Sequence, residues 1–192
     1  ESNFIFETAP FKECHASTIE ATPAGMVAAW FGGTKEKNPD VGIWISLQIN
    51  GNWSAPKEIF NGIQDKNTRY PCWNPVLFQV ENGPLLMFYK VGPNPDKWWG
   101  MLSKSTDNGQ TWSEAEKLPD CIIGPVKNKP EMLNNNVLLC PTSTEHNGWR
   151  VHMELTSDFG KTWSKVEVSS GENDYQAIQP SILKLGGENL QL

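Results

Sequence analysis

The stretch Ser105-Thr106-Asp107-Asn108-Gly109-Gln110-Thr111-Trp112 occurs a second time as Thr156-Ser157-Asp158-Phe159-Gly160-Lys161-Thr162-Trp163, and the two tryptophans are 51 residues apart. An aspartate in a turn accepts hydrogen bonds from its own backbone, so Asp107 is expected to bond amides two or three residues on. Gly109 supplies the positive φ that a tight hairpin needs. We predict a structural hairpin whose tryptophan, Trp112, packs beneath the turn.

Two further repeats share this register. Residues 46–53 (S-L-Q-I-N-G-N-W) keep the glycine and the tryptophan but lack the aspartate. A polar residue followed by proline and an apolar run starts at residues 74, 129 and 179. The eight-residue pattern resembles the Asp-box (BNR) repeat of the sialidase superfamily. The resemblance implies an all-β, sialidase-like β-propeller of four-stranded blades, and repeat units of about 50 residues suit such blades.

The short β-rich runs between turn residues predict four strands in each repeat and no helix. The expected blades cover residues 11–66, 67–122 and 123–172, and residues 173–192 begin the next one. Related propellers close with six blades, so about three and a half are present. Three alternatives stay open: the chain is part of a longer protein, it self-associates to complete the ring, or it stands as an open arc. We favour the first.

Composition excludes some functions. The chain has 192 residues, 16 basic and 22 acidic side chains and a formal net charge of −6, which argues against nucleic-acid partners. No apolar run approaches the ~18 residues of a membrane span. No metal motif is present, and no cofactor is implied. No signal peptide is visible at the first residue, but a cleaved leader leaves no trace, and we expect an extracellular or periplasmic protein.

Sites in propellers form where the inner strands and their loops converge on the central axis. Four residues at such places are catalytic candidates: His15, Glu36, Asp40 and Glu145. Histidine suits acid–base chemistry near neutral pH, and glycoside hydrolysis needs a pair of carboxyl groups. Each has a structural alternative. His15 can be a core histidine, and Asp40 lies in an Asn-Pro-Asp sequence that makes turns anyway.

A second set of residues is predicted to bind substrate. Cations suit a sugar carboxylate, amides suit hydroxyl groups, and an exposed tryptophan stacks on a sugar face. The alternative for the cations is ordinary surface charge, and for the tryptophan it is packing between blades. The members are Arg69, Asn74, Lys90, Trp98, Lys129, Arg150 and Gln179.

The resemblance does not carry the sialidase catalytic residues onto this chain. Sialidases hold the substrate carboxylate with three arginines, the first in a Phe-Arg-Ile-Pro motif on the first inner strand. Here that place reads C-H-A-S-T at residues 14–18, and the only arginines are Arg69 and Arg150. Asp40 lies about where the acid/base aspartate is expected. Residues 40–44 (D-V-G-I-W), 72–77 (C-W-N-P-V-L) and 127–130 (K-N-K-P) are similar to BNR-repeat proteins of bacterial glycan degradation.

Three functions are therefore weighed, all with a glycan partner. The first is a sialidase-like exo-glycoside hydrolase that acts on an acidic or otherwise decorated glycan. The second is a non-catalytic glycan-binding propeller, which the small number of arginines favours. The third is a polysaccharide lyase that uses His15 or a lysine as base.

Overall fold

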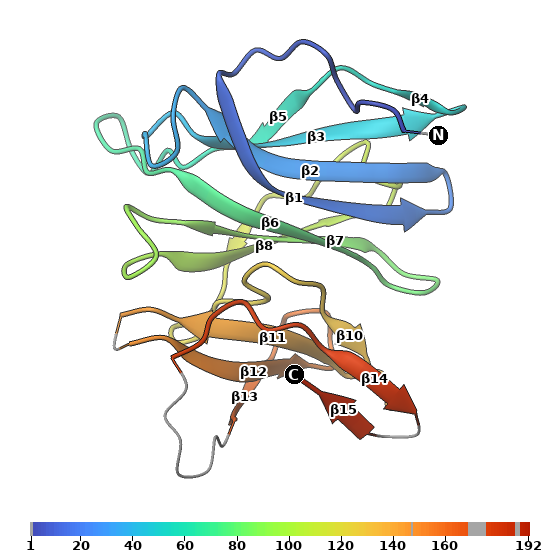
Figure 1. Cartoon of the computed structure of the whole chain (residues 1–192), viewed down its shortest axis with the longest axis vertical. Coiled ribbons are helices and arrows are strands. Elements are labelled where there is room, and N and C mark those ends of the chain that lie inside the picture. Colours follow the sequence, from blue (N-terminus) through green and yellow to red (C-terminus); the bar gives the residue numbers. More distant parts are fainter. Residues whose placement is uncertain (1, 147, 169–175, 187–188) are drawn as a thin grey trace.

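The computed structural model describes residues 2–146, 148–168, 176–186 and 189–192. Within these ranges the chain is all β, without helix, and its strands form four antiparallel sheets. The first three sheets follow one another along the long axis of the molecule in chain order, and the two-stranded fourth lies next to the third (Figure 1). No described segment forms a helix long and apolar enough to cross a membrane.

The first sheet has five strands. Its strands are β1 (Glu13–Thr22), β2 (Gly25–Gly33), β3 (Gly42–Ile49), β4 (Asn52–Trp53) and β5 (Lys57–Phe60). β2 lies between β1 and β3, and its residues from Val27 onward are all buried because both of its faces are covered. β1 alternates buried and exposed residues in its middle and carries a register shift between His15 and Thr18. This shift is a β-bulge, which re-aims side chains at a sheet edge.

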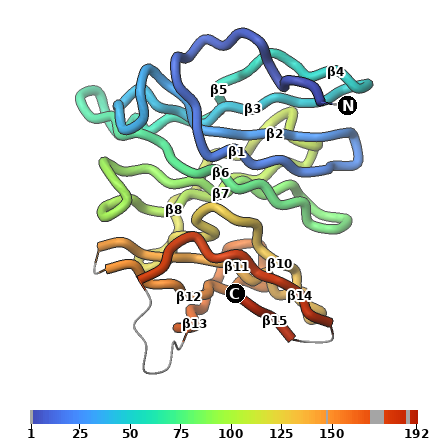
Figure 2. The backbone as a smooth tube through the Cα atoms, in the orientation of Figure 1, coloured from blue at the N-terminus to red at the C-terminus, as the bar shows by residue number. Residues whose placement is uncertain are grey.

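The next two sheets repeat the antiparallel order of four strands. The second consists of β6 (Cys72–Gln79), β7 (Leu85–Val91), β8 (Trp99–Ser105) and β9 (Glu116–Lys117). The third consists of β10 (Glu131–Met132), β11 (Leu138–Thr144), β12 (Arg150–Thr156) and β13 (Ser164–Glu167). β14 (Leu183–Gly186) and β15 (Asn189–Gln191) form the two-stranded start of a fourth. The smooth backbone trace in Figure 2 shows the same repeated meander.

This arrangement confirms the predicted fold class of four-stranded antiparallel sheets. The strand at the outer edge of the second sheet is short, because only Glu116 and Lys117 pair with β8. The blade boundaries and the six-bladed ring stay predictions, and the proposed boundary between residues 172 and 173 lies outside the described residues.

The hairpin at Asp107 is built from its own polar groups. One carboxylate oxygen accepts a hydrogen bond from the Thr111 amide at 2.9 Å, and the other accepts one from the Thr111 hydroxyl at 2.5 Å. Ser105 Oγ donates to Asp107 and accepts from the Gly109 amide, both at 2.8 Å. Trp112 Nε1 donates to Gly109 O at 3.1 Å. The aspartate thus bonds four residues on, one or two more than predicted, and the turn is structural.

The second hairpin repeats these contacts. Asp158 accepts from the Thr162 amide at 2.8 Å and from the Thr162 hydroxyl at 2.6 Å, and Trp163 Nε1 donates to Gly160 O at 3.0 Å. Gly109 and Gly160 have φ values of +88° and +91°, where a side chain is disfavoured. Two turns with the same hydrogen bonds explain why the same residues occur at the same spacing.

Two apolar clusters join the sheets to one another. The first combines β2 and β3 residues such as Val27 and Ile43 with β7 residues such as Met87 and Tyr89. The second places Phe88 and Leu102 of the second sheet against Leu138 and Cys140 of the third. Because each sheet buries one face against the next, the sheets hold one another in register along the stack.

Candidate functional site

Loops from all three complete sheets gather at one edge of the stack. They connect β2 to β3, β7 to β8 and β11 to β12, and they lie on the left in Figure 1. The beginnings of β1 and β6 lie at the same edge, because Glu13 pairs with Gly33 and Cys72 pairs with Val91. The repeated topology therefore brings most of the predicted site residues to one end of the protein.

A hollow of about 430 Å³ opens beside the start of β1. Its lining includes Lys12, Glu13, His15, Phe31 and Glu36. His15 Nδ1 lies 3.7 Å from Glu36 Oε2, and both side chains are exposed, by 72% and 44%. The Glu36 amide donates to Glu13 Oε2 at 3.2 Å. The histidine ring packs edge-on against Phe31, with centroids 5.6 Å apart. Two predicted residues, His15 and Glu36, are thus brought together.

Asp40 takes part in the same loop but not in this hollow. Its carboxylate accepts hydrogen bonds from the Thr34 amide and hydroxyl, both at 2.9 Å, so it closes the loop on itself. Arg69 Nη2 donates to Asp40 O at 3.0 Å and to Glu58 Oε1 at 3.3 Å. Asp40, predicted to be catalytic, and Arg69, predicted to bind substrate, therefore both hold the loop next to His15 in place.

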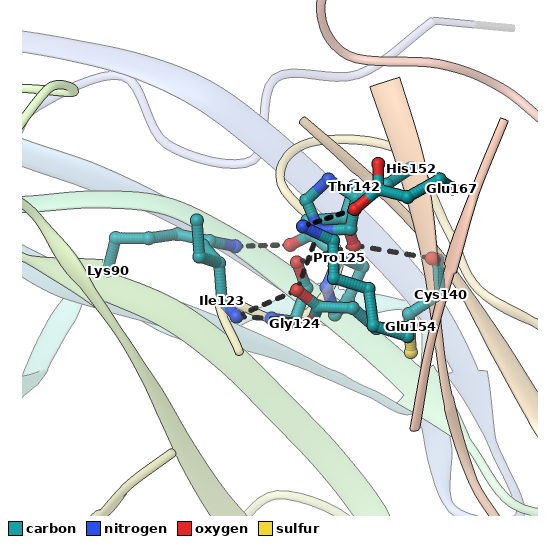
Figure 3. Close-up of polar contacts among 10 residues, drawn as sticks. Lys90, Ile123, Gly124, Pro125, Cys140, Thr142, His152, Glu154 and Glu167 are labelled. Carbon is teal, nitrogen blue, oxygen red and sulfur yellow. Dashed lines mark hydrogen bonds and ion pairs between the residues drawn. The ribbon is translucent and has the colours of Figure 1, made fainter. Parts of the chain in front are cut away.

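Lys90 lies in the interior rather than at the surface. Its side chain is fully buried, and its ammonium group donates to Pro125 O (Figure 3). Burial lowers the pKa of Lys90 to about 7, against a smaller opposing effect of the Glu154 carboxylate. A predicted substrate-binding cation is therefore part of the contact between the second and third sheets.

Glu154, which the sequence analysis did not single out, is the centre of this buried cluster. Its carboxylate accepts hydrogen bonds from the amides of Ile123, at 3.0 and 3.1 Å, and Gly124, at 2.6 Å. His152 Nε2 lies 2.9 Å from Glu154 Oε1, and both side chains are at most 1% exposed. The carboxylate ties the segment that connects the sheets to β12 (Figure 3). In the sequence, the one feature that pointed to this cluster is the alternation of His152 and Glu154 along a strand.

Two predicted polar residues, Asn74 and Gln179, share a left-handed backbone conformation with Ala16. Asn74 and Gln179 have φ values of 39° and 55°, and Ala16 has 53° at the matching place in β1. Asn74 is 8% exposed and lies at a register shift of β6, and the Gln179 amide donates to Ser143 Oγ at 3.1 Å. Their recurrence marks a repeated bend of the inner strands.

Lys129 connects three sheets. Its ammonium group pairs with Glu20 and donates to Leu77 O at 2.8 Å. Neighbouring Asn128 donates to Gln179 O at 2.8 Å. Asn128 and Lys129 thus bind neighbouring inner strands.

A second hollow, of about 410 Å³, lies between the second and third sheets at the same edge. Predicted Trp98 lines it together with Asp96 and His146. The carboxyl group of predicted Glu145 is near Asp96, and the pKa of Glu145 is raised by burial and by the Asp96 charge. Arg150 is exposed and donates to Trp149 O at 3.2 Å. Asp96 was not among the predicted residues, although it follows the Pro-Asn-Pro run beside Trp98.

Within the described ranges, no group of three or more His, Cys, Asp and Glu side chains is placed to hold a metal ion. The chemistry that the edge offers therefore consists of carboxylates, histidine, lysine and tryptophan at two neighbouring hollows.

Comparison with known proteins places these observations in a family context. The family model described as a BNR repeat-like domain matches residues 25–192. A search of the curated proteins found no match. Among solved structures, a protein of unknown function from Dyadobacter fermentans is 15% identical with a TM-score of 0.71, and the alignment covers 94% of this chain and 61% of that one.

Two enzymes of known activity have the same fold. A Trypanosoma rangeli sialidase in complex with sialic acid is 15% identical with a TM-score of 0.63, covering 93% of this chain and 33% of that one. A Penicillium chrysogenum α-L-arabinanase complexed with arabinobiose is 21% identical with a TM-score of 0.54, covering 86% and 51%. The likeness at these identities shows the fold alone, and the chain spans between 33% and 61% of the length of these three proteins.

Proposed function

Because this chain belongs to the BNR repeat-like family, we propose that it is the glycan-active part of a sialidase-like exo-glycoside hydrolase that acts on an acidic sugar. Structures with this fold include a sialidase described with sialic acid and an arabinanase described with arabinobiose, which supports a carbohydrate substrate. Fold alone does not determine function, so the proposal depends on the loop edge.

The hollow beside β1 is the observation that carries the proposal. It brings two carboxylates, Glu13 and Glu36, beside His15 and Lys12. Hydrolysis of a glycosidic bond uses one carboxyl group to protonate the leaving oxygen and a second to activate water or attack the sugar. Lys12 offers a positive charge to the carboxylate of an acidic sugar. Open access from solvent suits an enzyme that removes terminal sugars.

The test is the hydrolysis of aryl glycosides of sialic acid and of uronic acids by the intact protein. Glu36→Gln should lower kcat by about 10²–10⁴-fold, the usual contribution of a general acid or base, while the thermal unfolding midpoint stays near the wild-type value. Glu81→Gln is the matched control, because Glu81 is exposed in the turn between β6 and β7 at the opposite edge. Wild-type kcat in Glu36→Gln would remove the assignment.

The pairing of His15 with Glu36 favours a second candidate, a lyase that acts on uronates. A carboxylate beside one ring nitrogen orients a histidine as general base and leaves Nε2 toward solvent. The base would take the proton next to the uronate carboxylate, a carbon–carbon double bond would form, and the glycosidic oxygen would leave with its electron pair and gain a proton. The ultraviolet absorbance of an unsaturated product distinguishes this reaction from hydrolysis, and binding without either product supports a binding propeller.

A further inference from the structure

The hollow between the second and third sheets has the composition of a sugar-binding surface. Its floor is largely apolar, from residues such as Leu118 and Ile123, and two half-buried tryptophans, Trp98 and Trp99, form its wall. Charged groups lie around the rim, including Asp96 and His146. An apolar pocket with a few convergent polar groups is the usual form of a small-molecule site.

The two tryptophans have different neighbours. Lys117 Nζ lies over one face of the Trp99 ring, 5.7 Å from its centroid. Trp98 instead packs edge-on against Trp73, with centroids 6.1 Å apart and an interplanar angle of 69°. Trp73 is 3% exposed, and its Nε1 donates to Gly92 O at 2.9 Å. The support beneath Trp98 is therefore rigid, and a rigid aromatic ring loses little entropy when it binds a ligand.

Two carboxyl groups lie in this region, and one of them, Asp96, lines the hollow. Asp96 comes from the loop between β7 and β8, and Glu145 follows β11. Partial burial and the nearby Asp96 charge raise the pKa of Glu145. Carboxyl oxygens accept hydrogen bonds, so Asp96 in the hollow suits the hydroxyl groups of a sugar.

A row of aromatic rings connects this hollow to the one beside β1. His15 packs on Phe31, Phe31 on Trp73, and Trp73 on Trp98, with ring centroids 5.6, 5.9 and 6.1 Å apart. Their sum, about 18 Å, is an upper limit for the separation of the His15 and Trp98 rings. An oligosaccharide of a few sugar rings spans that distance along the loop edge.

We propose that the hollow at Trp98 is a second subsite for the same glycan, in which Trp98 stacks on a sugar further along an acidic oligosaccharide while Asp96 binds its hydroxyl groups. The terminal sugar of that chain occupies the hollow at His15. This inference rests on the proposed function, and it makes the protein selective for acidic oligosaccharides over single acidic sugars.

The experiment compares KM for sialylated and uronate-containing di-, tri- and tetrasaccharides with KM for the aryl monosaccharides, using the intact protein. Trp98→Ala should raise the ratio of oligosaccharide KM to monosaccharide KM about tenfold, as truncation of an aromatic anchor does. Trp98→Phe keeps an aromatic ring, so its ratio of oligosaccharide KM to monosaccharide KM should lie close to the wild-type ratio. Trp53→Ala, at the opposite edge, is the control and should leave the ratio unchanged.

Each outcome decides the inference. An unchanged ratio in Trp98→Ala, with wild-type activity retained, overturns the second subsite and leaves the proposed function intact. A wild-type protein that neither binds nor cleaves any acidic glycan overturns the proposed function, and the subsite with it. If thermal unfolding shows that Trp98→Ala does not fold, Asp96→Asn takes its place, because Asp96 is exposed. That variant should raise the same ratio severalfold, and a wild-type ratio would overturn the subsite.

Discussion

Replacing Glu154 with alanine should destabilise the protein more than any surface substitution. The carboxylate is fully buried and accepts hydrogen bonds from the amides of Ile123 and Gly124, at distances from 2.6 to 3.1 Å. His152 Nε2 lies 2.9 Å away. Alanine has no side-chain acceptor, so the Gly124 amide and His152, which are buried, and the Ile123 amide, which is half-buried, lose this partner.

The magnitude follows from these three donors. A buried donor left unsatisfied costs about 1–3 kcal/mol, so Glu154→Ala should lower the free energy of unfolding by about 3–6 kcal/mol when partial relaxation is allowed for. Domains of this size are stable by about 5–15 kcal/mol, so the variant approaches the limit of folding. With a shift of about 2–4 °C per kcal/mol, its unfolding midpoint should fall by roughly 6–24 °C.

The assay is urea-induced unfolding followed by tryptophan fluorescence, with linear extrapolation to water. Glu154→Gln keeps one acceptor oxygen and should lie between the alanine variant and wild type, and Glu81→Ala, at an exposed turn, is the control. A loss below about 1 kcal/mol in Glu154→Ala would refute the reasoning, because it would mean that the donors find other partners at little cost.

Two further predictions concern pH. Burial lowers the pKa of Lys90 from 10.5 to about 7, so between those values the unfolded chain binds a proton that the folded protein lacks. The free energy of unfolding should therefore rise with pH across this window, by up to about 1.4 kcal/mol per pH unit more than in Lys90→Met. Urea titrations of both proteins at several pH values measure this difference. The same dependence of unfolding free energy on pH in both proteins would contradict the prediction. Hydrogen bonds from Thr111 lower the pKa of Asp107 from 3.8 to about 2. The stability that Asp107 contributes is present above pH 3.8 and is lost as the pH falls through 2. The unfolding midpoint of Asp107→Asn should therefore decrease less on acidification than that of the wild-type protein. An equal decrease in both proteins would show that this carboxylate is not involved.

Much of the fold could be predicted because its signals are local. The turns at Asp107 and Asp158 use the side chains of their own eight residues, so the same residues must recur wherever the turn does. The reach of the aspartate was misjudged, since its partner lies four residues on. The short pairing of β9 was also not visible, because the number of residues that pair depends on the path of the connecting segment.

The candidate site could be predicted only in part. The repeat placed His15 and Glu36 at the same edge of one sheet, and they are neighbours in the structure. Glu13 and Asp96 were not predicted, since nothing in their local sequence distinguishes them from surface carboxylates. Lys90 was expected at the substrate, but its direction depends on the third sheet, which buries it against Pro125.

The sequence by itself determined the class of fold, the repeated turns and the edge at which the loops meet, because these depend on the spacing of residues along one chain. Tertiary structure alone decided which polar groups are exposed in the hollows at His15 and Trp98 and which are consumed inside, as at Glu154. The physical reason is that burial and hydrogen-bond partners come from neighbouring sheets, and segments some 30 residues apart, such as Ile123 and Glu154, meet only after the sheets have packed.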